Sequence, residues 1–117
     1  MAKRKADFGY QGEKLHKARL CLMAPHPQGE ARSFASAFHE CSLAFHDFDE
    51  NSVKDVSAQH WIATIKRLMN TDGIEDPTGE GTYIYRARVM SEKEQLDFSH
   101  AVDELASWFD MQFWSEN

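Results

Sequence analysis

The chain has 117 residues, 42 % of them hydrophobic, and a formal net charge of −6 at pH 7. This length suits a single domain, and eight Phe and three Trp residues provide bulk for a core, which excludes a disordered chain. The acidic balance disfavours general attraction to nucleic acid or to an anionic membrane.

We expect neither a membrane span nor a signal peptide. No apolar run approaches the roughly 20 residues that a transmembrane helix needs. The basic start is not followed by the apolar stretch of a secretory signal. We therefore expect a cytoplasmic protein, in which Cys21 and Cys41 remain thiols and pack as small hydrophobes.

The chain is expected to divide into an arm and one domain. Residues 1–11 are predicted to form a flexible basic N-terminal arm that carries Lys3, Arg4 and Lys5. Residues 12–117 are predicted to form a single helical domain.

The first helix is predicted over residues 12–24. Leu15, Ala18 and Leu22 fall on one side of such a helix. Pro25 and Pro27 end it, because proline lacks a backbone N–H and restricts the residue before it.

The second helix is predicted over residues 30–48, and the third over 53–69 with Asn51 or Ser52 as its N-cap. The apolar seam of the second helix consists of Phe34, Phe38, Cys41, Phe45 and Phe48. The buried face of the third consists of Val56, Trp61, Ile62, Ile65, Leu68 and Met69. Gly73 then suits the left-handed backbone of a terminating turn.

Residues 82–90 alternate in the manner of a strand. Tyr83 and Tyr85 fall on one side of the alternation, and Arg86 and Arg88 on the other. A lone strand lacks a partner in a helical chain, so this region is expected either to pair with residues near 18–24 or to be a short extended segment that crosses the helices.

The last helix is the most strongly marked. Ser91 and Glu94 form a capping box, in which each side chain accepts a hydrogen bond from the backbone N–H of the other residue. The apolar stripe behind it consists of Phe98, Val102, Leu105, Phe109 and Phe113, widened by Ala101 and Trp108. A stripe of this size needs other helices to cover it, so the predicted fold is all-α, an irregular bundle of three to four helices.

Two acid–histidine pairs stand three residues apart and raise a metal-site alternative. Glu13 and His16 fall in the first helix, and Asp97 and His100 in the last. Two such pairs on facing helices supply half of the ligands in di-metal carboxylate bundles. However, His100 falls opposite the apolar face of its helix, so our preferred interpretation has no metal and no other cofactor.

Nucleophilic catalysis has little support. Cys41 lies within the apolar seam, where a thiol ionises poorly. No serine stands in a glycine-framed turn like a nucleophile elbow. His60, beside Trp61, fits an interfacial histidine better than a general base. We therefore expect no enzymatic activity.

Partner-binding residues are expected in two places. Leu96 and Trp114 fall away from the main apolar face of the last helix, where a Trp suits a contact anchor. The second group combines Tyr and Arg, residue types enriched at interfaces, and consists of Tyr83, Tyr85, Arg86 and Arg88.

The leading hypothesis is a small cytosolic protein-binding or inhibitor-like module without catalytic activity, whose partner is another protein or a second copy in a homodimer. Small acidic helical proteins of this kind occur among immunity, antitoxin and mobile-element proteins. This comparison is an analogy at the level of the fold and does not rest on a shared motif. One alternative is a metal-binding bundle or metal-dependent enzyme built on the acid-x-x-His pairs. The other is weak nucleic-acid binding through the basic arm.

Overall fold

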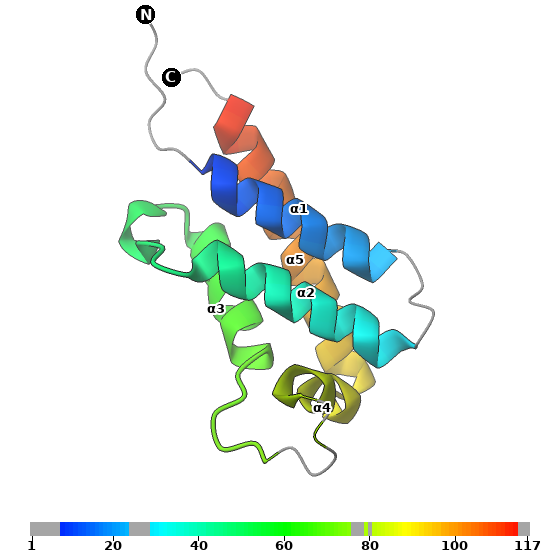
Figure 1. Ribbon diagram of the computed structural model, residues 1–117. Coiled ribbons are helices and arrows are strands. Elements are labelled where there is room, and N and C mark those ends of the chain that lie inside the picture. The colour runs from blue at the N-terminus through cyan, green and yellow to red at the C-terminus, as the bar shows by residue number, and fades with distance from the viewer. Residues whose placement is uncertain (1–7, 24–28, 76–78, 80, 115–117) are drawn as a thin grey trace, which may run out of the picture.

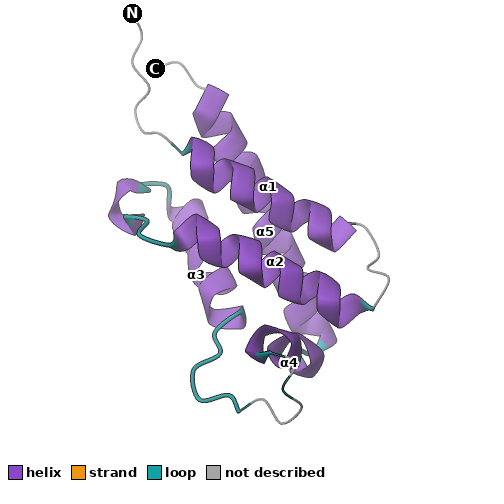
Figure 2. Cartoon of the chain, viewed as in Figure 1, coloured by secondary structure: helices purple, strands orange, loops and turns teal. Residues whose placement is uncertain are grey.

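The computed structural model describes residues 8–23, 29–75, 79 and 81–114, with side chains as far as residue 112. This part of the chain is all-α, as predicted, and it contains no strand (Figure 2). Its elements in chain order are α1 (Gly9–Met23), α2 (Glu30–Phe45), the 3-10 helix η1 (Glu50–Ser52), α3 (Val56–Leu68), α4 (Thr82–Val89) and α5 (Glu92–Trp114).

The helices form two layers and an end piece. Figure 1 shows α1 and α2 side by side and antiparallel, in front of α3 and α5, while α4 lies across one end. α1 packs against both α2 and α5, α3 packs against α5, and α4 packs against α2. None of the helices in the described ranges combines the length and apolar character that crossing a bilayer requires.

The stripe of α5 forms the centre of the core as far as its side chains are described, as its spacing predicted, and Phe113 lies outside the residues whose side chains are described. Phe98, Val102, Leu105 and Phe109 are fully buried. Phe98 and Phe109 each anchor a group of aromatic rings, one towards each end of the bundle. We name them the Phe98 cluster (Phe34, Phe38, Tyr83 and Phe98) and the Phe109 cluster (Phe8, Phe48, Trp108 and Phe109).

Ring contacts within each cluster join helices from different layers. Phe38 of α2 meets Phe98 edge to face, with ring centroids 4.9 Å apart. Phe8, directly before α1, lies 5.4 Å from Phe109 between ring centroids. Such pairs add about 0.5–1.5 kcal/mol each beyond the burial of their area, so α5 is held at two separate levels.

The first helix begins earlier than we expected. α1 starts at Gly9 instead of residue 12, and Phe8 is buried, so residues 8–11 do not belong to a loose arm. The rest of the predicted arm, with Lys3, Arg4 and Lys5, is not part of the described chain. The burial of Phe8 in the Phe109 cluster explains the early start, because it fixes the chain directly before the first turn.

The connection between α2 and α3 is also longer than predicted. α2 ends at Phe45, and Asp47 has a φ of 54°, which turns the chain there. The N-cap of α3 is Asp55, whose carboxylate accepts a hydrogen bond from the Ala58 N–H at 3.0 Å. Val56 is therefore the first helical residue and is 78 % exposed, which corrects its assignment to the buried face.

Residues 82–89 form a helix and not an extended segment. Ile84, Ala87 and Met90 are buried, three residues apart, and this spacing places them on one side of α4 against α2. Arg86 and Arg88 fall in its last turn, where positive charge complements the helix dipole. A helix satisfies its backbone internally, whereas a lone strand would leave its N–H and C=O groups unpaired.

The start of α5 is fastened by the predicted capping box and by an arginine. The Ser91 N–H donates to Glu94 Oε1 at 2.9 Å, and the Glu94 N–H donates to Ser91 Oγ at 3.1 Å. Arg86 Nε donates to the Leu68 carbonyl oxygen at 2.7 Å, and its Nη2 lies 3.5 Å from Glu94 Oε2. Arg86 thus joins the end of α3 to α4 and to the first turn of α5.

Gly12 allows the close approach of α1 to α5. A Cβ atom at this position would lie 3.3 Å from the Phe109 Cβ, which is tighter than ordinary van der Waals contact. Because Phe109 is fully buried and surrounded by other rings, it has little room to move.

We predict that Gly12→Leu destabilises the fold by about 1–3 kcal/mol, because overpacking separates α1 from α5, although leucine favours a helix by roughly 0.8 kcal/mol over glycine. Urea denaturation followed by circular dichroism measures the change. Lys17→Leu is the matched control at an exposed position of α1 and should stay within about 0.5 kcal/mol of the parent. Equal stability of the two variants would contradict the close contact.

Glu94 should make stability depend on pH. The hydrogen bond from the Ser91 N–H, helped by Arg86, lowers the pKa of the Glu94 carboxyl. The folded state therefore gains stability above the unfolded pKa of about 4.3, and loses it as the pH falls through the lowered folded pKa. Glu94→Gln should cost about 0.3–1 kcal/mol at pH 7 and much less at pH 2.5, measured by urea titration at both pH values. A difference that persists at pH 2.5 would refute this role.

Candidate protein-binding groove

A groove opens where the end of α1 meets the first turns of α2 and α5. Its volume is about 690 Å³, and it is lined by Leu22, Met23, Gly29, Glu30, Ser33, Phe34, Glu92, Gln95, Leu96 and Ser99. We name it the Met23–Leu96 groove after its two most exposed apolar side chains.

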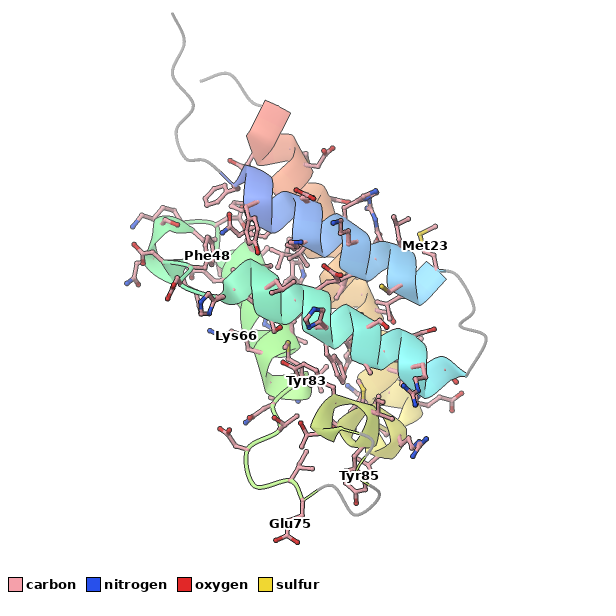
Figure 3. The ribbon with its side chains drawn as sticks, viewed as in Figure 1. Met23, Phe48, Lys66, Glu75, Tyr83 and Tyr85 are labelled. Carbon is pink, nitrogen blue, oxygen red and sulfur yellow. The ribbon has the colours of Figure 1, made fainter. Side chains whose placement is uncertain are left out.

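The rim of the groove is apolar and exposed. Met23 is 72 % exposed and Leu96 is 68 % exposed, while Phe34 beneath them is buried. Figure 3 shows Met23 projecting from the end of α1, away from the middle of the bundle. Single exposed hydrophobes are ordinary, but here two of them line one groove together with a buried Phe, which gives a concave surface with apolar contacts.

The charges in the groove are acidic. Glu30 and Glu92 are exposed, and among the described lining residues no side chain is basic. Glu30 stands in the first turn of α2 and Glu92 in the first turn of α5, where a carboxylate also complements the helix dipole. The groove therefore presents apolar contacts framed by negative charge.

The structure separates the predicted partner-binding residues. Leu96, which lies outside the core face of α5, lines the Met23–Leu96 groove. Trp114 is the last residue of α5, and its side chain is not described.

The expected Tyr and Arg group is divided by the helix that carries it. Tyr83 is half-buried and packs on Phe38 with ring centroids 5.7 Å apart. Tyr85 lies on the outer side of α4 in Figure 3, since two residues span about 200° of a helix. Arg86 is engaged with Leu68 and Glu94, and Arg88 is exposed. A contact of these four residues with a partner stays a prediction, but they do not share one surface.

The two acid–histidine pairs face different neighbours. Glu13 and His16 line a hollow between α1 and α5, whereas Asp97 and His100 line a groove between α3 and α5. Within the described ranges no group of three or more His, Cys, Asp or Glu side chains is placed to hold a metal ion. The geometry therefore does not assemble the di-metal alternative.

Other acidic residues have structural roles. Asp49 and Asp55 cap η1 and α3, and Glu50 pairs with Lys66. These contacts orient the carboxylates of Asp49 and Asp55, and Lys66 balances the charge of Glu50.

Sequence reasoning missed Met23. Met23 follows Leu22 at the end of α1, so the sequence pattern gave no reason to separate it from the apolar face of that helix. No signal in the neighbouring residues indicated that it would line a groove with Leu96. The groove consists of three segments that are distant in the sequence, and only the packing of α1, α2 and α5 brings them together.

No family model matches this chain, and no curated protein or solved structure matches it. The groove and the chemistry of its lining therefore carry the functional proposal.

The two thiols are predicted to react very differently. Cys41 is fully buried and Cys21 half-buried, and both are free. Burial, followed by the nearby negative charge of Glu40, raises the pKa of both thiols. Iodoacetamide at pH 8 should label Cys21 slowly and Cys41 only in denaturant, as followed by peptide mass spectrometry. Equal labelling of the two in the folded protein would contradict this packing.

Proposed function

We propose that the protein is a protein-binding module of the adaptor or inhibitor type, without catalytic activity, and that it binds its partner through the Met23–Leu96 groove. The observation that supports this most directly is the pair of exposed apolar rims above a buried Phe34. A cytoplasmic location is part of the same proposal.

The occupant we propose is an amphipathic helix of another protein. Helices dock into apolar grooves with side chains spaced by one helical turn, and the rims offered by Met23 and Leu96 suit such anchors. We expect the partner helix to carry Lys or Arg beside its apolar residues, because opposite charges to Glu30 and Glu92 would guide encounter and orientation. A second copy of this chain is the less favoured occupant, since the groove itself carries no basic residue among its described lining.

The test is an NMR titration of the full chain with a designed peptide. The peptide is an amphipathic helix with Leu on one face and Lys on its flanks, and a counterpart carries Glu in place of Lys. We expect the Lys peptide to shift amide signals of residues 22–23, 29–34 and 92–99, and the Glu peptide to leave them unchanged. Shifts spread over other surfaces, or equal shifts with both peptides, would overturn the proposal.

Variants of the rim sharpen this experiment. Leu96→Asn and Met23→Asn should each weaken the Lys peptide about tenfold, the loss of roughly one apolar anchor. Val56→Asn is the matched control, because Val56 is as exposed as the rim residues but lies outside the groove. Sedimentation equilibrium of the parent chain covers the other occupant: a dimer that Leu96→Asn dissociates would replace the peptide partner by a second copy.

A further inference from the structure

A second groove lies between α3 and α5 and shares no lining residue with the Met23–Leu96 groove. Its volume is about 460 Å³, within the range of small-molecule sites. Each helix contributes a stripe with spacings of four and three residues. The stripe of α3 is His60, Thr64 and Arg67, and the stripe of α5 is Lys93, Asp97 and His100, with Trp61 and Ala101 beside them.

Positive charge dominates this α3–α5 groove, although the whole chain is acidic. Arg67 and Lys93 are permanent cations, and Asp97 is the one carboxylate among the described lining residues. Lys93 Nζ lies 2.8 Å from Asp97 Oδ2. This hydrogen bond, together with the charges of Lys93, Arg67 and His100, lowers the pKa of Asp97. The basic side chains of both helices line the same groove.

The groove also offers apolar and hydroxyl groups. Trp61, which is half-buried, lines the groove, and the small side chain of Ala101 belongs to the same lining. Thr64, half-buried on the same stripe, adds a hydroxyl group. An aromatic surface next to a guanidinium and an ammonium group suits a ligand with a flat ring and an anionic end.

We propose that the α3–α5 groove binds a phosphate monoester that carries an aromatic ring, with a nucleoside monophosphate as the ligand class. Arg67 and Lys93 bind the phosphate, since a guanidinium donates two parallel hydrogen bonds to phosphate oxygens and an ammonium group adds a point charge. The aromatic ring lies against Trp61. Asp97 competes with the phosphate for Lys93, and so it limits the affinity.

Isothermal titration calorimetry of the full chain tests the ligand class. The probes are AMP, ribose 5-phosphate and adenosine, each at low salt. We expect AMP to bind with one-to-one stoichiometry and each of the other two at least about tenfold more weakly, because each lacks one of the two recognition elements. No binding of AMP at millimolar concentration would overturn the site. Equal binding of AMP and ribose 5-phosphate would overturn the role of Trp61 and with it the ligand class.

Substitutions test the assignment of residues. Arg67→Gln should weaken AMP about tenfold, whereas Asp97→Asn should strengthen it about fivefold by freeing Lys93. A gain of affinity is an effect that a purely structural role of Asp97 would not produce. Lys54→Gln is the matched control, because Lys54 is exposed and lies outside the groove, and it should bind AMP as the parent does. Thermal melts monitor folding, and unchanged affinity in both Arg67→Gln and Asp97→Asn would refute the proposal.

Discussion

The fold depends on covering one face of α5. Phe98 and Phe109 stand three turns apart on that face, and both are fully buried. Each buried Phe contributes about 1.5–3 kcal/mol, so an arrangement that leaves one of them in water loses about that much stability. The Phe98 cluster requires α2 and α4 at one level, and the Phe109 cluster requires α1 and the α2–α3 connection at the other. The two layers of helices arise because both aromatic clusters are built on α5 and have to be covered at the same time.

Much of this architecture could be predicted from apolar spacing. The seams of α2 and α5 have helical periodicity over several turns. Phe34, Phe38 and Cys41 of the first seam are buried, while Phe45 and Phe48 are partly buried, and Phe48 lies beyond the end of α2. The capping box of α5 could also be predicted from the sequence, because its two hydrogen bonds join only Ser91 and Glu94. α4 could not be predicted in this way. Its eight residues fit a period of two as well as a helix, and the choice depends on α2, which packs against it.

The candidate site was accessible to sequence reasoning only in part. Leu96 was identified because it has no place on the core face of α5, and the structure puts it on a rim. Met23 completes that rim through packing between helices, which no local pattern encodes. Asp97 and His100 were considered as metal ligands only in an alternative, on the basis of their spacing. In the structure Lys93 Nζ lies 2.8 Å from Asp97 Oδ2, and this hydrogen bond, helped by the charge of Arg67, lowers the pKa of Asp97.

The contact between Gly12 and Phe109 joins the first helix to the last. During synthesis, α1 can pair with α2 as soon as both have emerged, but its contacts with α5 form only after α5 has been made. The Met23–Leu96 groove forms at the same late moment, because its two rims belong to these helices. Under the function proposed above, a nascent chain that lacks α5 therefore also lacks its binding surface. The topology thus imposes an order in time on the assembly of the groove.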